Sequence, residues 1–217
     1  MSTFLLKTLC KLSLKSSFFL IGLVFTFLPA FSQEQTNSDT IAYSMEEALK
    51  DPLNIKVLDL QKQKLKVLGN NFDKLVNLHT LYLDKNKLSD LPPSLASCKE
   101  LKKISFSNNK FETLPEVICQ LEQLRTLDFS TNEIAVLPDC LKNLIHLQYL
   151  LMVGNEVSKI PESLNDLELV ELDMRMIQMN EAEQAAISKL FPNTTIKFSK
   201  ACNCFGEEEE VIESDSN

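Results

Sequence analysis

The sequence is poor in the residues that most enzyme sites need. It has two histidines, His79 and His146, four glycines and no tryptophan among 217 residues. Neither histidine belongs to a Ser-His-Asp order, an H-E-x-x-H motif, a glycine-rich phosphate loop or a paired cysteine motif. These absences favour a protein that is not an enzyme and that uses no cofactor and no resident metal.

Basic charge is also in deficit, with 22 lysines and arginines against 30 acidic residues and a net charge of -8. No basic patch is visible along the chain, which excludes nucleic acid as the expected partner. Residues 201–217 are predicted to be an acidic disordered tail, because like charges repel there and few apolar groups offset the entropy of ordering. This tail is either a solubilising end or a docking segment for a basic partner. Its acidic residues are Glu207, Glu208, Glu209, Glu210, Glu213 and Asp215.

The first 32 residues have the pattern of a secretory signal. Three lysines precede an apolar run from Phe18 to Leu28, and the small residues Ala30 and Ser32 occupy the positions that a signal peptidase requires. We expect cleavage before Gln33 and export of the chain. An uncleaved anchor is the alternative, but the run is shorter than the roughly 20 residues of a spanning helix. No stable membrane span is therefore expected after cleavage.

Five cysteines follow the signal segment, and an odd number leaves at least one unpaired. They do not form a disulfide framework, because a chain of this length can build a core without one. The sequence leaves their disulfide state open. The C-x-C at Cys202 and Cys204 admits a redox pair or two soft metal ligands, as well as a disulfide near a cap or two free thiols. The five are Cys98, Cys119, Cys140, Cys202 and Cys204.

A 23-residue repeat dominates the middle of the chain. Its copies begin at Leu78, Leu101, Leu124 and Leu147, and each follows L-x-x-L-x-L-x-x-N-x-L and then x-x-L-P. A copy that begins at Ile55, before these four, and a partial copy that begins at Leu169, after them, lack the consensus Asn, as end repeats often do. We therefore expect about six repeats over residues 55–179.

This spacing resembles the 23-residue typical class of leucine-rich-repeat proteins, and with the signal segment it is similar to small exported bacterial members. The resemblance implies an α/β solenoid, a curved arc with a parallel β-sheet on its concave face and short helical caps at both ends. The repeat pattern is specific for the fold, but it indicates almost nothing about the partner.

The repeat has a physical explanation at each position. Leu81 and Leu83 point inward from a short strand, while Tyr82 and Asp84 point outward. About seven apolar positions per repeat, each worth roughly 1.5–3 kcal/mol when buried, dominate the stability. The second repeat's remaining core positions are Leu88, Leu91, Leu95 and Cys98.

One asparagine recurs in each consensus repeat, where the strand turns away. A buried amide is costly unless it is hydrogen-bonded, so we interpret these residues as a structural ladder that bonds the backbone of its own turn and of the adjacent repeat. The ladder consists of Asn86, Asn109, Asn132 and Asn155.

Both solenoid ends need a cap. Residues 33–54 are predicted to be a linker and a helical cap, with Ser44 and Glu47 as a capping box. Residues 180–200 are predicted to be a helix and strand cap that opens with Asn180 and Glu183. We expect the helix to run to Leu190 and a strand to follow over residues 194–198. The expected apolar stripe of the helix is Ala182, Ala186, Ile187 and Leu190.

The outward strand positions form the surface on which we expect binding of a protein partner by a monomeric chain. Tyr149, Leu151 and Val153 place three apolar groups on an otherwise polar face, which is typical of interfaces. Flanking Asp128 and Arg175 supply charge. Alternatively, this row packs beneath the C-terminal cap or tail. Carbohydrate binding at the cell envelope is a further reading, but it needs aromatic platforms, and only Tyr82 and Tyr149 qualify.

Overall fold

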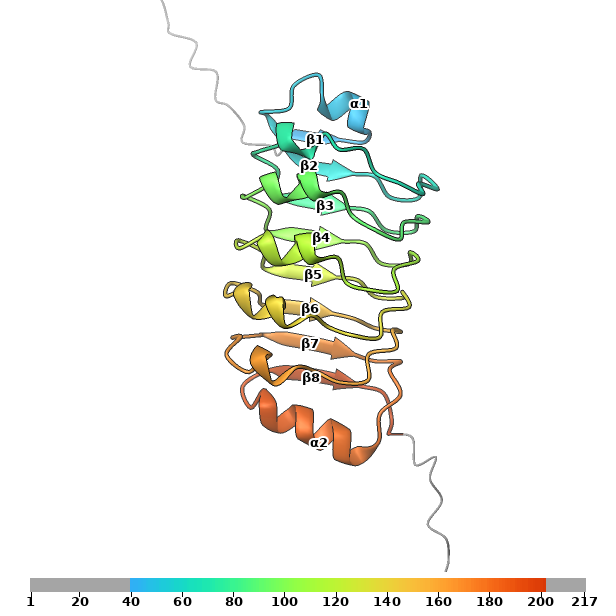
Figure 1. Ribbon diagram of the computed structural model, residues 1–217, viewed down its shortest axis with the longest axis vertical. Coiled ribbons are helices and arrows are strands. Elements are labelled where there is room, and N and C mark those ends of the chain that lie inside the picture. The colour runs from blue at the N-terminus through green and yellow to red at the C-terminus, as the bar shows by residue number, and fades with distance from the viewer. Residues whose placement is uncertain (1–39, 202–217) are drawn as a thin grey trace, which may run out of the picture. The chain divides into compact units, whose positions relative to one another are not determined.

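The computed structural model describes residues 40–201, which form one eight-stranded parallel sheet with the strands in chain order (Figure 1). Each strand is followed by a return segment on the other side of the core, which is usually a short 3₁₀ helix. The elements are β1 (Thr40–Ala42), α1 (Met45–Ala48), β2 (Ile55–Asp59), η1 (Phe72–Lys74), β3 (Thr80–Tyr82), η2 (Pro93–Ser97), β4 (Lys103–Ser105), η3 (Glu116–Gln120), β5 (Thr126–Asp128), η4 (Asp139–Asn143), β6 (Tyr149–Leu151), η5 (Glu162–Leu164), β7 (Glu171–Met174), α2 (Glu181–Leu190) and β8 (Thr195–Phe198).

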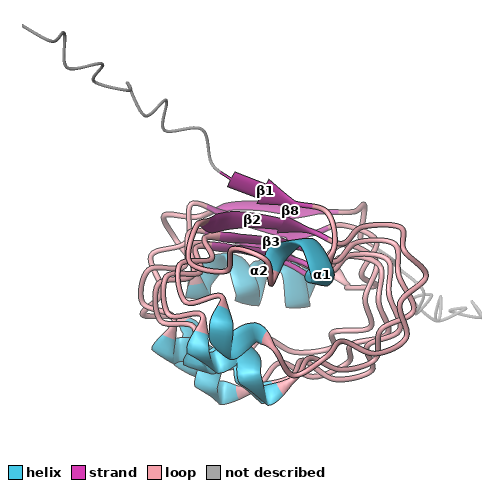
Figure 2. Cartoon of the chain, turned by 90° about the horizontal axis from the view of Figure 1, so that it is seen from above, coloured by secondary structure: helices cyan, strands magenta, loops and turns pink. Residues whose placement is uncertain are grey.

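The 23-residue period sets the strand register. Leu81 pairs with Ile104, which is 23 residues later, and Leu127 follows it in the next strand. Figure 2 shows the result from above: the strands form one wall, and the 3₁₀ helices lie on the opposite wall. The predicted solenoid with a parallel sheet on one side is confirmed.

The core fills the space between these two walls. The consensus apolar positions of the second repeat, Cys98 included, are buried as predicted. Phe106 and Phe129 replace leucine at one strand position, and the Phe106 ring lies 4.7 Å from Phe111 and 6.1 Å from Phe129 between ring centroids. These larger rings fill the middle of the solenoid.

A proline precedes each of the later 3₁₀ helices. Pro92, Pro115, Pro138 and Pro161 have φ between -74° and -59° and take the N-cap position of η2, η3, η4 and η5. The fixed φ of proline suits this position, where no ladder N–H is needed.

The N-terminal end begins with a strand that the repeat pattern does not contain. β1 pairs with β2 and adds an edge strand before the first repeat. In α1, the Ser44 hydroxyl accepts from the Glu47 N–H, as predicted. The Glu47 carboxylate, however, accepts from the N–H of Tyr43, one residue earlier than in the expected capping box.

The C-terminal end has the predicted helix and strand. Asn180 and Glu183 form a full capping box for α2, and β8 pairs with β7. The predicted apolar stripe is only partly correct, because Ala182 and Ala186 are exposed and Ile187 is the one buried residue of α2. The flanking residues Met179 and Phe191 are buried instead, since large side chains cover more of the open core end than alanine does.

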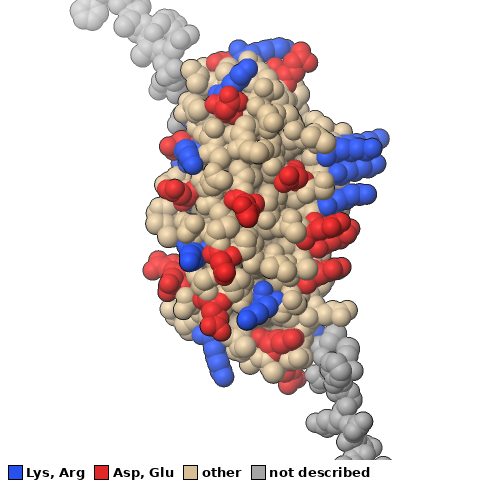
Figure 3. Space-filling model, viewed as in Figure 1, with Lys and Arg blue, Asp and Glu red and all other residues tan. Residues whose placement is uncertain are grey.

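The turns that contain the ladder asparagines line the edge at the carboxyl ends of the strands. Figure 3, in the orientation of Figure 1, shows lysine and arginine side chains gathered along the upper part of this edge and acidic side chains below them. The expectation that no basic patch exists is therefore wrong. Stacking brings together lysines that are about one repeat apart in the sequence.

Candidate functional site

The asparagine ladder connects every turn to the turn before it. The amide of Asn132 donates to the carbonyl of Phe129 in its own turn at 2.8 Å and to that of Phe106 in the preceding repeat at 3.2 Å. Its carbonyl oxygen accepts from the N–H of Phe111 at 3.1 Å. Asn86, Asn109 and Asn155 repeat this pattern. The ladder holds the strand ends at a fixed spacing, and with them the outward side chains.

The ladder is not buried uniformly. Asn86, Asn132 and Asn155 are buried, whereas Asn109 is half-buried. Asn109 nevertheless forms the same hydrogen bonds. Bonding of the amide, rather than full burial, is the property that the four share.

Tyr149, Leu151 and Val153, here called the apolar row, lie on and just after β6. Tyr149 pairs in register with Thr126 and Glu171 on its two neighbours, and Leu151 pairs with Asp128 and Asp173. Tyr149 is 39% exposed, and Leu151 and Val153 are half-buried. The helical C-terminal end of the solenoid does not bury this row.

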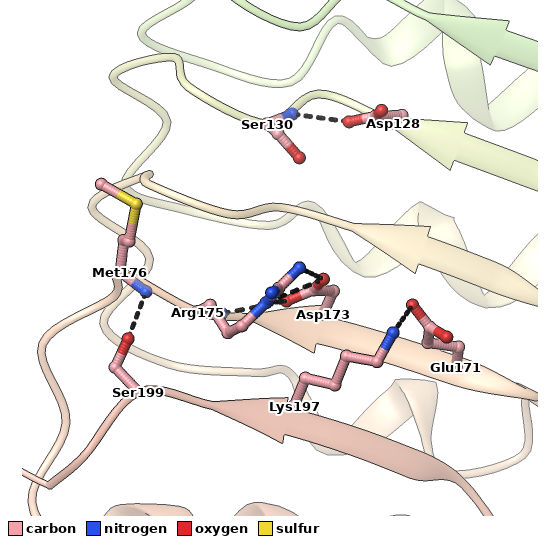
Figure 4. Close-up of polar contacts among 8 residues, drawn as sticks. All are labelled: Asp128, Ser130, Glu171, Asp173, Arg175, Met176, Lys197 and Ser199. Carbon is pink, nitrogen blue, oxygen red and sulfur yellow. Dashed lines mark hydrogen bonds and ion pairs between the residues drawn. The ribbon is translucent and has the colours of Figure 1, made fainter.

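Carboxylates border the apolar row on both sides. On β5, the Asp128 side chain accepts from the N–H of Ser130 at 3.0 Å and is half-buried (Figure 4). It forms no ion pair with any residue from 40 to 201. Asp128 is therefore a negative charge held in place beside Leu151 without a cationic partner in the described part of the chain.

At the end of β7, Asp173 and Arg175, the first residue after the strand, neutralise each other. Arg175 Nε lies 2.9 Å from Asp173 Oδ1, and Nη2 lies 2.7 Å from Oδ2. Burial raises the pKa of Asp173, but hydrogen bonds from the Arg175 side chain and backbone, and the charge of Arg175, outweigh it and hold this pKa below its usual range. The same carboxylate raises the pKa of Arg175. Figure 4 shows the guanidinium folded back over Asp173, so Arg175 is a positioned group and not a free cation.

The last strand adds a second ion pair on this face. Lys197 Nζ of β8 lies 2.7 Å from a carboxylate oxygen of Glu171 on β7 (Figure 4). Of the three carboxylates that border the apolar row, Glu171 and Asp173 are thus compensated. Asp128 is the one that is not.

Tyr82 lies apart from the other predicted binding residues. It belongs to β3, three strands from β6 in the sheet, and the Lys103 ammonium sits 5.0 Å over its ring. Next to it, Asp84 accepts from the hydroxyls of Ser105 and Ser107 and from the N–H of Ser107. The structure groups Asp128, Arg175 and the apolar row, and separates Tyr82 from them.

One exposed aromatic residue at the N-terminal edge of the sheet was missed. Tyr43 directly follows β1 and is 60% exposed. It was overlooked because β1 lies before the first copy of the repeat, and no periodic signal marked its neighbours as a strand.

Two cysteines on the return side form a disulfide. Cys119 and Cys140, in η3 and η4 of adjacent repeats, are joined with their Cα atoms 5.6 Å apart. Cys98 is buried and free, and burial, followed by the nearby negative charge of Asp73, raises the pKa of its thiol to about 12. Cys202 and Cys204 lie outside the described residues, as do the signal segment and the acidic tail.

Between residues 40 and 201, no group of three or more histidine, cysteine or acidic side chains is placed to hold a metal ion. Within that range no helix has the length and apolar character needed to cross a membrane.

The sequence matches the family model for a leucine-rich repeat region over residues 42–195. The chain belongs to the leucine-rich-repeat family. A comparison with curated protein sequences finds no match.

Solved leucine-rich-repeat structures share this fold. A leucine-rich-repeat protein of Leptospira interrogans is 24% identical with a TM-score of 0.57, over 76% of this chain and 49% of that one. A second is the ectodomain of the Arabidopsis thaliana receptor kinase GASSHO1/SCHENGEN3 in complex with CASPARIAN STRIP INTEGRITY FACTOR 2. It is 21% identical with a TM-score of 0.57, over 76% of this chain and 20% of the ectodomain. An internalin of Listeria monocytogenes is 18% identical with a TM-score of 0.54, over 73% of this chain and 60% of the internalin. The leucine-rich-repeat chain described here spans about half of the Leptospira protein and a fifth of the receptor ectodomain.

Proposed function

We propose that this leucine-rich-repeat chain is an exported, non-enzymatic module that binds a protein partner on the outward face of its sheet, centred on the apolar row. The observation that carries the proposal is the position of Leu151 in register between Asp128 and Asp173, beside an exposed Tyr149. Apolar groups bordered by charge are typical of binding surfaces. The fixed spacing of the strand ends means that little ordering is needed on binding.

The charges beside the row favour one chemistry for the partner. Asp173 and Glu171 already have cations, whereas Asp128 has none among the described residues. A partner segment that places an apolar side chain on Tyr149 and Leu151 and a lysine or arginine near Asp128 complements this surface. The receptor ectodomain with the same fold supports the class of function only, because identity is low and the shared length is a fifth of that protein.

The disulfide supports export. Cys119–Cys140 joins two adjacent repeats, and such bonds persist mainly in oxidising compartments. Intact-mass measurement of the chain recovered from the secreting cell tests the cleavage directly. We expect a species that begins at Gln33, and a chain that still begins at Met1 would contradict this part of the proposal.

Carbohydrate binding is the weaker candidate. Tyr82 and Tyr149 are three strands apart, which is about 14 Å at the usual strand spacing. The ammonium of Lys103 occupies one side of the Tyr82 ring. The two tyrosines therefore do not form one aromatic platform.

A pull-down that compares matched variants tests the proposal. Leu151→Asp and Tyr149→Ala each alter the apolar row, and we expect both to lower recovery of the captured protein by more than tenfold. Val136→Asp is the control, since it adds the same charge at a site that is 69% exposed and lies in the segment before Pro138, away from the sheet. Unchanged capture by both row variants, with folding confirmed by circular dichroism, would exclude this face.

A further inference from the structure

A second charged surface lies on the turn edge, away from the apolar row. In each of the first three repeats, the residue directly after the ladder position is an exposed lysine. These are Lys64, Lys87 and Lys110. The N–H of Lys87 donates to the carbonyl of Leu65, and the N–H of Lys110 to that of Leu88. These bonds stack the three lysines one repeat apart, at about 4.8 Å per strand spacing.

Two further lysines extend this line. Lys62 and Lys85 precede the ladder position in the first two repeats, and the N–H of Lys62 donates to the carbonyl of Asp84 in the turn beside it. We call Lys62, Lys64, Lys85, Lys87 and Lys110 the lysine ridge. Ion pairs within residues 40–201 join Arg175 to Asp173 and Lys197 to Glu171, so no ridge lysine is compensated there.

The charge on this edge reverses after the third repeat. Glu133 and Glu156 occupy the position of Lys64, Lys87 and Lys110 in the next two repeats, and Figure 3 shows acidic side chains below the basic ones. Five lysines without ion pairs repel one another and bring no stability to the turns. Lys62 and Lys85 also have φ near +58°, a conformation that favours Asn or Gly, and the equivalent site in later repeats is held by Asn108, Thr131 and Gly154. Lys64, two residues after Lys62, has a φ of +59°. The turn alone does not account for lysine here.

The described chain ends on this same edge. The N–H of Met176, in the turn after β7, donates to the Ser199 hydroxyl at 2.7 Å (Figure 4). β4 lies four strand spacings from β8, or about 19 Å, and β2 lies six spacings away, or about 29 Å. From Ala201 to Glu207 an extended chain spans about 20 Å, and to Glu210 about 30 Å.

The sequence after Ala201 complements this edge in charge as well as in length. Residues 202–206 carry no charge, and they have the length needed to pass the acidic repeats. An extended chain of this length would bring Glu207 to Glu210 to the level of the ridge. We propose that the acidic segment from Glu207 to Asp215 binds the lysine ridge of its own chain, so that this edge is an anion-binding surface for an acidic polypeptide.

Zero-length carbodiimide cross-linking of the dilute purified chain, followed by peptide mapping, tests the proposal. We expect Glu207 to Glu210 to couple to ridge lysines at several times the yield for Lys189, an exposed lysine of α2 that is closer along the chain. These products should be monomeric and should disappear in 1 M salt. Preferential coupling to Lys189 would overturn the proposal. Coupling only within cross-linked dimers would assign the ridge to a second copy and would also overturn it.

Lysine acetylation rates give a second test that does not depend on cross-linking. In a chain with Glu207, Glu208, Glu209 and Glu210 changed to Gln, we expect Lys64, Lys87 and Lys110 to react at least threefold faster than in the unaltered chain. Lys142 and Lys159 are exposed matched lysines and should react at equal rates in both chains. Equal ridge rates would show that the acidic segment does not occupy the ridge.

Discussion

Asp173 and Arg175 form a two-pronged ion pair at the end of β7, with Nε 2.9 Å from Oδ1 and Nη2 2.7 Å from Oδ2. The Asp173 side chain is 5% exposed, and that of Arg175 is 55% exposed. A buried carboxylate thus anchors a guanidinium at the rim of the candidate site. The pair fixes the charge on one side of Leu151, while Asp128 on the other side stays uncompensated.

This pair makes stability depend on pH. The pKa of Asp173 is lower in the folded chain than the ordinary value of about 3.9, so the pair stabilises the fold above that pH. This contribution is lost as pH falls from about 3.9 through the folded pKa. We expect Asp173→Asn to lower the free energy of unfolding at pH 7 and the gap to the unaltered chain to narrow at pH 3. Urea unfolding of both chains at pH 7 and pH 3 checks this prediction. An equal difference in the free energy of unfolding at the two pH values would contradict the ionic contribution.

The asparagine ladder predicts that replacing a ladder asparagine lowers the free energy of unfolding much more than replacing an exposed asparagine outside the ladder. Asn132→Ala removes an amide that bonds Phe106 and Phe129 and leaves the N–H of Phe111 without its acceptor. We expect a loss of about 2–3 kcal/mol in the free energy of unfolding. Asn143→Ala, at an exposed site in η4, should change it by less than about 0.5 kcal/mol. Similar losses in urea titrations of the two variants would argue against the ladder.

The disulfide links adjacent repeats across 21 residues of sequence. Opening it frees a loop of that length in the unfolded chain, so the double variant Cys119→Ser/Cys140→Ser should be less stable by about 2–4 kcal/mol. Reductant should lower the stability of the unaltered chain by a similar amount and leave the double variant unchanged. A reductant effect of equal size on both chains would place the redox-sensitive bond elsewhere.

Cys98 should behave as a core residue and not as a reactive thiol. Its pKa of about 12 keeps it protonated at neutral pH, and its side chain is fully buried. Peptide mapping after alkylation at pH 7.5 should find Cys98 unmodified in the native chain and modified in 6 M guanidinium. Rapid native labelling of Cys98 would mean that the second repeat opens readily.

The repeat made most of the fold predictable. Large apolar residues recur every 23 residues at the positions of Leu78, Leu81 and Leu83, and this one pattern determines the strands, their parallel register and the inward side chains. The capping residues of α2 were also readable, because Asn180 and Glu183 are three residues apart. Repeating features are visible in a sequence because stacking needs the same residue at the same place in each copy.

Features that depend on neighbouring repeats without following the period were harder to predict. Cys119 and Cys140 are 21 residues apart, so they occupy different positions of their repeats, and only the folded return side brings them together. The lysine ridge does follow the period, with Lys64, Lys87 and Lys110 spaced by 23 residues, but it was missed because charge was judged from the acidic balance of the whole chain and not by repeat position. Which outward side chains already have partners, as Arg175 has in Asp173, also depends on side-chain geometry.

The affinity of the isolated partner for matched variants tests the central claim most directly. The measurement is titration calorimetry with the unaltered chain, Leu151→Asp, Asp128→Asn, Val136→Asp and Asp166→Asn, the last two being exposed controls of equal charge change. We expect the Kd to rise more than tenfold for Leu151→Asp and severalfold for Asp128→Asn, with the controls within twofold of the unaltered chain. Equal affinity across all five folded chains would contradict recognition through the apolar row.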